Sequence, residues 1–211
     1  MTRCLDIHTH HPAPRPWAVV DAPFQDFSPL EGQRYSVGIH PWLTIGNIPL
    51  QQWEALEKAA MCPEVVAIGE CGIDKIKGGF MFRQVSAMQK QVELSEKLGK
   101  PLIVHDVKAH DVVVGLKKDL EPKQNWVVHG FRGKPTVAKM LTDAGIYLSY
   151  GENFNSEALL ITPPDMILAE TDESILPIEA IIEKLSAVLG FDAMPLVEAN
   201  TAKFLSGNPS I

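Results

Sequence analysis

The chain has 211 residues, of which 45% are hydrophobic and 21% charged, and these values are ordinary for a soluble globular enzyme. Its net charge of -7 argues against a broadly basic surface that grips duplex nucleic acid through many phosphate contacts. No apolar run approaches the roughly 20 residues of a membrane span, and the chain does not open on a signal-like segment. We therefore expect one cytoplasmic domain over residues 1–211, acting as a monomer.

The cysteines point to a reducing environment. Cys4, Cys62 and Cys71 are odd in number and lack regular spacing. This pattern argues against a disulfide framework and against a Cys-x-x-Cys zinc site. We expect the three thiols to be reduced and partly buried.

Short apolar runs alternate with helical patterns along the chain. Strands are predicted, in chain order, at residues 5–10, 17–22, 35–39, 65–68, 102–104, 126–128, 146–150 and 166–169. Helices are predicted at residues 50–60 and 82–98, in a segment that ends near 120, and at 136–144, 178–189 and 194–205. Continuous apolar strands that alternate with helices favour a parallel sheet buried on both faces, so seven or eight of them predict an α/β fold, a TIM-type (β/α) barrel.

The first part of the chain departs from a regular barrel. Residues 11–16 hold three prolines and cannot carry a helix. They also form a connection shorter than the dozen or so residues that a parallel crossover usually needs. The predicted barrel is therefore distorted or incomplete, with an early helix missing.

Two histidines stand at the end of the first predicted strand. His8 and His10 are two residues apart, so their side chains leave a strand on the same face and can share one metal ion. A lone histidine pair is more often structural than metal-binding. The residues that accompany it decide which interpretation is favoured.

Further metal-ligand side chains follow the ends of other predicted strands, and these ends converge at the mouth of a barrel, where active sites lie. Together with the histidine pair, the set is His8, His10, Glu70, His105, His129 and Asp172. Imidazole with carboxylate suits zinc, manganese or iron. Glu70 is the candidate to bridge two ions about 3.5–4 Å apart, an arrangement that supports hydrolysis at neutral pH.

Seven motifs, in order along nearly the whole chain, resemble those of the TatD family of metal-dependent deoxyribonucleases in the amidohydrolase superfamily. They are Asp6-Ile-His8-Thr-His10, Gly38-Ile-His40-Pro41, Gly69-Glu70-Cys-Gly72-Ile-Asp74, Pro101-Leu-Ile-Val-His105, His129-Gly-Phe131-Arg-Gly133, Glu170-Thr-Asp172 and Asn200-Thr-Ala-Lys-Phe204. The resemblance implies a distorted TIM barrel that hydrolyses DNA phosphodiester bonds with two divalent metal ions, whose identity (Zn, Mg or Mn) is left open.

The resemblance also implies roles for individual residues. One metal would be held by His8, His10, Glu70 and Asp172, and the second by Glu70, His105 and His129. Asp172 would orient or deprotonate the attacking water, with Glu70 as the bridging catalytic carboxylate. His40 would face the substrate phosphate.

The chain departs from the family pattern around the substrate. The stretch before Gly38 is shortened, and Lys75 follows the Gly-Ile-Asp motif where aromatic residues are common. Val107 stands at a usual arginine position with Lys108 next to it, and Arg132 replaces a usual serine. We take Lys108 and Arg132 as candidate substrate contacts, although solvated loop charges are an equal interpretation.

Because of these departures, the sequence does not decide which substrate the protein hydrolyses. DNA, single-stranded or at frayed ends because of the acidic surface, is the first hypothesis. The alternatives are hydrolysis of a small ester, amide or phosphoester at the same site, and a binding protein with a degenerate site.

Overall fold

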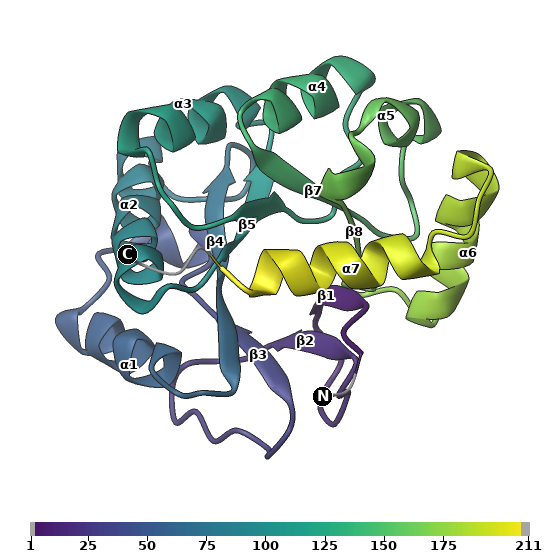
Figure 1. Cartoon of the computed structure of the whole chain (residues 1–211). Helices are drawn as coiled ribbons and strands as arrows, with labels where there is room; N and C mark the ends of the chain where they lie inside the picture. Colours follow the sequence, from purple (N-terminus) through teal and green to yellow (C-terminus); the bar gives the residue numbers. More distant parts are fainter. Residues whose placement is uncertain (1–2, 208–211) are drawn as a thin grey trace.

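The protein, described here by a computed structural model of residues 3–207, is built on one eight-stranded parallel sheet whose strands follow one another in chain order (Figure 1). The strands are β1 (Asp6–Thr9), β2 (Ala18–Asp21), β3 (Arg34–Val37), β4 (Val65–Asp74), β5 (Leu102–Val107), β6 (Trp126–Val128), β7 (Ile146–Tyr150) and β8 (Ile167–Ala169). An isolated parallel bridge between Thr9 and Asp172 links the two edges of the sheet. The distorted barrel predicted from the sequence is therefore confirmed.

Helices follow the strands from β3 onward and cover the outside of the sheet. They are the 3-10 helix η1 (Pro41–Ile45), α1 (Leu50–Ala60), α2 (Met81–Leu98), α3 (His110–Leu120), α4 (Pro135–Asp143), α5 (Ser156–Ile161), the 3-10 turn η2 (Pro164–Met166), α6 (Ile178–Leu189) and α7 (Met194–Leu205). All six predicted helices are present within one or two residues of their expected ends. The short helix α5, which the side chain of Asn155 caps, was not predicted because six residues are too few to show a helical period.

The two connections at the start of the barrel, residues 10–17 and 22–33, hold no helix in the described chain. The buried side chain of Gln33 ties them together instead. Its amide nitrogen donates to the carbonyl oxygens of Arg15 and Ala18, both at 3.0 Å, and its oxygen accepts from the backbone nitrogen of Arg15. This side chain satisfies backbone groups that a helix would otherwise cover, so the early helix can be absent.

Strands β4 and β5 extend beyond their predicted ends. The sequence places the end of β4 before Gly69, but the strand continues through Glu70 to Asp74. Gly69 and Gly72 adopt φ angles of 150° and 143°, and a Cβ on either would overlap the backbone of β5. Only glycine, which has no side chain, lets the two strands approach so closely. The pairing register between β4 and β5 also shifts here, between Ile68 and Cys71.

The barrel interior is filled by a separate apolar cluster made of Cys4, Ile7, Val19, Ala67, Ile103, Val127, Tyr147, Leu168 and Phe204. Helix α7 crosses the strands in Figure 1 and contributes Phe204, whose ring lies 5.4 Å from that of Tyr147. Asn125, just before β6, donates to the carbonyl oxygen of Phe204. Helix α7 therefore closes the amino ends of the strands, and their carboxyl ends remain free to form a site.

The three cysteines are free thiols, and Cys4 and Cys71 are buried, in line with the sequence. Burial raises the pKa of the Cys4 thiol to about 12. Within residues 3–207, no helix has both the length and the apolar character needed to cross a membrane.

Candidate metal centre

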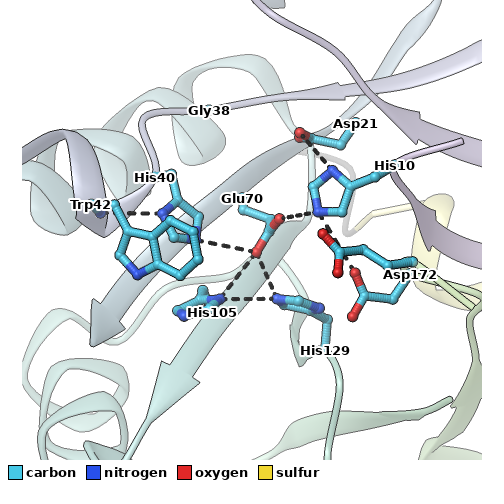
Figure 2. A pocket seen from close by; sticks show the side chains of 10 residues that line it. His10, Asp21, Gly38, His40, Trp42, Glu70, His105, His129 and Asp172 are labelled. Atoms are coloured by element: carbon cyan, nitrogen blue, oxygen red, sulfur yellow. Dashed lines mark hydrogen bonds and ion pairs between the residues drawn. The ribbon is translucent and has the colours of Figure 1, made fainter. Parts of the chain in front are cut away.

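The predicted ligands come together at the carboxyl ends of the strands. His8 lies in β1 with His10 directly after it, Glu70 in β4, His105 in β5, His129 just after β6, and Asp172 three residues after β8. They surround a cavity of about 390 Å³, shown in Figure 2. Its lining consists of His10, Asp21, Gly38, His40, Trp42, Glu70, His105, His129, Asp172 and Glu173, with His8 fully buried beside it.

The carboxylate of Glu70 stands at the centre of this cluster, and its oxygen Oε1 faces the histidine pair of the first strand. Nε2 of His10 lies 2.9 Å from it, and Nε2 of His8 lies 3.3 Å away. Asp172 approaches the same two nitrogens with Oδ1, at 3.6 Å from His10 and 3.9 Å from His8. Ligand atoms of His8, His10 and Asp172 all lie within 4.8 Å of one another, as a shared ion requires.

The other oxygen of Glu70, Oε2, faces a second group of imidazoles (Figure 2). It lies 2.7 Å from Nε2 of His129, 3.1 Å from Nδ1 of His105 and 3.6 Å from Nε2 of His40. The two nitrogens of His105 and His129 are 3.3 Å apart. One carboxylate thus presents one oxygen to each of two donor groups, and this is the geometry of a bridging ligand.

The residues present fit divalent metal ions. Both ring nitrogens of His8 and Nε2 of His105 are buried and make no hydrogen bond. A buried polar atom without a partner costs free energy, and few such atoms occur in native proteins. Coordination would satisfy Nε2 of His8, the nitrogen that faces Glu70 and Asp172, and the mixed imidazole and carboxylate donors suit zinc or manganese.

The charges of the cluster are coupled. Burial by itself would raise the pKa of Glu70, but the charge of His129 and hydrogen bonds from His10, His105 and His129 hold it well below its usual range. The hydrogen bond to Glu70 in turn raises the pKa of His10 to about 9. Glu70 is therefore ionised at neutral pH, as a metal-bridging carboxylate must be.

Two carboxylates behind the imidazoles, Asp21 partly buried and Glu170 fully buried, are not among the residues predicted from the sequence. Oδ2 of Asp21, the last residue of β2, lies 3.5 Å from Nδ1 of His10. Oε1 of Glu170 lies 3.5 Å from Nδ1 of His129 and accepts from the backbone nitrogen of Gly130 at 2.6 Å. Both stand at strand ends, so the positional argument that selected Glu70 applies to them as well.

Asp74, at the end of the extended β4, is a third unpredicted carboxylate. Its Oδ2 accepts from the indole nitrogen of Trp42 at 2.7 Å and lies 3.5 Å from Nε2 of His105. Although burial would raise its pKa, the hydrogen bond from Trp42 and two from backbone nitrogens lower it. Asp74 therefore fixes the ring of Trp42 at the mouth of the cavity.

The three predicted substrate contacts lie at different distances from the main cavity. His40 lines the cavity, and its ring packs against that of Trp42 with 4.6 Å between centroids. Arg132 lines a neighbouring cavity of about 210 Å³ that shares Asp172 with the first. Lys108 is exposed and is absent from the lining of either cavity, so its contact with a substrate stays a prediction.

Several known proteins are similar to this chain. A family model described as TatD related DNase matches residues 30–180. The uncharacterized metal-dependent hydrolase TatD of Mycobacterium tuberculosis is 30% identical over 131 residues, which cover 56% of this chain and 49% of that protein. The 3'-5' ssDNA/RNA exonuclease TatD of Escherichia fergusonii is 30% identical over 151 residues, which cover 63% of this chain and 58% of that protein.

A solved structure extends the likeness in fold to the whole molecule. The crystal structure of YjjV, a TatD homolog from Escherichia coli, superposes with a TM-score of 0.81 at 19% identity and covers 98% of this chain and 99% of its own. The chain spans only 49% and 58% of the two curated relatives named above. The family model nevertheless covers most of the sequence, including His40, Glu70, His105, His129 and Asp172. The chain belongs to the TatD related DNase family.

Proposed function

We propose that this protein is a hydrolase that cleaves phosphodiester bonds in single-stranded nucleic acid with two divalent metal ions. The observation that carries the proposal is the carboxylate of Glu70, which directs one oxygen to His8 and His10 and the other to His105 and His129. A single bridging carboxylate between two donor groups is typical of two-metal hydrolytic sites.

The proposal assigns the ligands as follows. One ion is held by His8, His10, Glu70 and Asp172, and the other by Glu70, His105 and His129. Bound there, divalent ions such as Zn, Mg or Mn would lower the pKa of water to about 7 and neutralise charge on a phosphate.

The remaining chemistry falls to side chains at the opening of the cavity. Asp172 lies at the surface of the cluster, with its carboxylate next to His10 and in the lining of the cavity. There it orients the attacking water and accepts its proton. His40 lies on the opposite side of Glu70 and contacts the phosphate of the substrate.

The nucleic-acid substrate is supported by the relative named as an ssDNA/RNA exonuclease and by the family itself. A single strand fits better than a duplex because the net charge is -7, and duplex binding draws its affinity from many cationic contacts.

A second candidate, hydrolysis of a small ester, amide or phosphoester, is favoured by one observation. None of the described residues that line the main cavity is Lys or Arg. Lys75, which follows the β4 motif, pairs with Asp111 at 2.9 Å. A small substrate needs no cation beyond the metal ions.

Metal analysis combined with cleavage assays separates the two candidates. The purified protein is assayed for bound metal, and then for cleavage of single-stranded and duplex DNA with Mg²⁺ or Mn²⁺. About two ions per chain with cleavage of the single strand supports the first candidate. Metal binding and turnover of small phosphoesters or amides, with DNA left intact, supports the second. Asp172→Asn should be inactive, whereas Asp143→Asn, on the outer surface of α4, should retain full activity.

A further inference from the structure

Apolar and basic side chains that are exposed or half-exposed gather beside the cavity, on η1, in the loop after β4 and at the start of α2. We call this surface the aromatic rim, and it consists of Trp42, Ile45, Lys77, Phe80, Phe82 and Arg83. Its four apolar members are between 44 and 69% exposed. Large apolar side chains gathered on a surface mark a site of interaction, whereas single ones need no explanation.

The aromatic rim is continuous with the cavity because Trp42 belongs to both. In a 3-10 helix the side chains at i and i+3 lie on one side, so Trp42 and Ile45 share a side of η1, about 6 Å apart along its axis. Pro41 and Thr44 occupy the buried side. The exposed side of η1 therefore leads from the cavity outward.

Helix α2 continues this surface. Nη1 of Arg83 donates to the carbonyl oxygen of Ile45 at 2.6 Å, and this bond fastens the first turn of α2 to the end of η1. Gly79 packs so closely on η1 that a Cβ there would overlap the carbonyl group of Thr44. Phe80 and Phe82 are thus held next to the outer end of η1.

Cations alternate with the rings of the aromatic rim. Nζ of Lys77 lies 4.5 Å from the centre of the Trp42 ring, and the guanidinium carbon of Arg83 lies 5.8 and 5.7 Å from the rings of Phe80 and Phe82. The two phenyl rings are 6.1 Å apart and nearly parallel, at 15°. Within residues 3–207, neither cation pairs with a carboxylate, although the protein as a whole is acidic.

We propose that the aromatic rim binds the bases and backbone of a single-stranded nucleic acid whose end enters the cavity. The inference rests on the proposed function and names the surface that holds the rest of the substrate. Exposed aromatic faces stack on bases of any sequence, and unpaired cations between them attract phosphates. A second copy of the chain is the alternative occupant, because aromatic residues and arginine are also enriched in protein interfaces, and the test distinguishes the two.

The test measures binding without cleavage. A fluorescein-labelled oligothymidylate of twelve nucleotides is titrated with the protein in the presence of a chelator, which prevents cleavage. The fluorescence anisotropy of the oligonucleotide gives Kd. We expect Phe80→Ala/Phe82→Ala to weaken binding on the order of tenfold or more. Phe191→Ala removes a similarly exposed ring from the turn between α6 and α7 and should leave Kd unchanged. Lys77→Gln should reduce the slope of log K against log salt by about 0.7.

A second readout separates this inference from the proposed function. With metal added, Phe80→Ala/Phe82→Ala should raise KM for the oligonucleotide and leave turnover of bis(p-nitrophenyl) phosphate unchanged, since that compound is too short to reach the aromatic rim. If the wild-type protein cleaves no DNA but its oligonucleotide Kd still depends on Phe80 and Phe82, the aromatic rim stands and the nuclease proposal fails.

One result would overturn the inference: an oligonucleotide Kd that is the same for wild type and Phe80→Ala/Phe82→Ala. Sedimentation would then show whether the wild type is a dimer that the double substitution converts to a monomer. In that case the surface joins two copies of the chain.

Discussion

The carboxylate of Asp21 lies behind the imidazole of His10. Its Oδ2 is 3.5 Å from Nδ1, while Nε2 on the far side of the ring is 2.9 Å from Glu70. A histidine that binds a metal through one nitrogen commonly directs the other to a carboxylate, which sets the tautomer and the orientation of the ring. Asp21 therefore positions His10 toward the centre of the site.

The first prediction concerns this pair. Asp21→Asn should lower the affinity for divalent metal by about 10- to 100-fold, because the amide no longer favours the tautomer with the proton on Nδ1. Competition with a metal-sensitive dye measures the affinity. Glu54→Gln, an exposed substitution on α1, serves as the control. An unchanged affinity in Asp21→Asn would show that the carboxylate does not act on His10.

Glu70 should be indispensable for activity. Glu70→Gln keeps the shape of the side chain but removes the charge that faces both donor groups. We expect turnover to be abolished and the metal content to fall below two ions per chain, with the far-UV circular dichroism unchanged, because residues at a barrel mouth serve function more than stability. Normal turnover in this variant would refute the assignment of Glu70 as a metal ligand.

Metal removal should be reversible. Chelation should stop hydrolysis, and Mg²⁺ or Mn²⁺ should restore it, because the barrel core is separate from the site. The thermal midpoint should rise again with added metal, since a ligand at 100 times its Kd stabilises the folded state by about 2.7 kcal/mol. Activity that persists in chelator, with no metal found by elemental analysis, would contradict a metal-dependent reaction.

Gly72 should resist substitution. With φ at 143° and a Cβ that would overlap the backbone of His105, Gly72→Ala combines backbone strain with displacement of β5. We expect a loss of at least about 2 kcal/mol in the free energy of unfolding. Gly115→Ala is the control, because nothing lies within 4 Å of its Cβ in α3, and it should gain about 0.5–1 kcal/mol. Urea denaturation compares the two, and equal effects would refute the close approach of β4 and β5.

Lys117 should make stability depend on alkaline pH. Its ammonium donates to the carbonyl oxygen of Gln124 and lies 5.0 Å from the Trp126 ring, and burial lowers its pKa to about 8. The unfolded chain keeps this proton up to about pH 10.4, so it binds more protons than the folded chain between these values. The free energy of unfolding of wild type, relative to Lys117→Met, should therefore rise between pH 8 and about 10.4.

Below pH 8 both states of wild type carry the charge, and Lys117→Met should be the more stable protein because it buries no ammonium. The difference should not exceed about 3 kcal/mol, because a tenfold difference in the acid dissociation constant between the folded and unfolded chain corresponds to about 1.36 kcal/mol. Denaturation of both proteins at several pH values measures the difference. A gap that does not change with pH would show that Lys117 titrates normally.

Local patterns in the sequence were enough to predict the alternation of strands and helices, the absent early helix and the gathering of six side chains at the strand ends. Each of these depends on short-range chemistry. Apolar runs show periodicity, the prolines of residues 11–16 exclude a helix, and His8 and His10 leave a strand on one face. Parallel strands then bring their carboxyl ends together, so the positions of Glu70 and Asp172 along the chain were sufficient to place them at one site.

Only the tertiary structure decided how these side chains meet. The extension of β4 to Asp74 depends on contact with β5, some thirty residues away, through the bare backbone of Gly69 and Gly72. Three further contacts likewise join segments that are far apart in the sequence. They are the contacts of each Glu70 oxygen, the position of Asp21 behind His10 and the hydrogen bond from Trp42 in η1 to Asp74. Such relations depend on the register and spacing of neighbouring strands, which no single segment of sequence encodes.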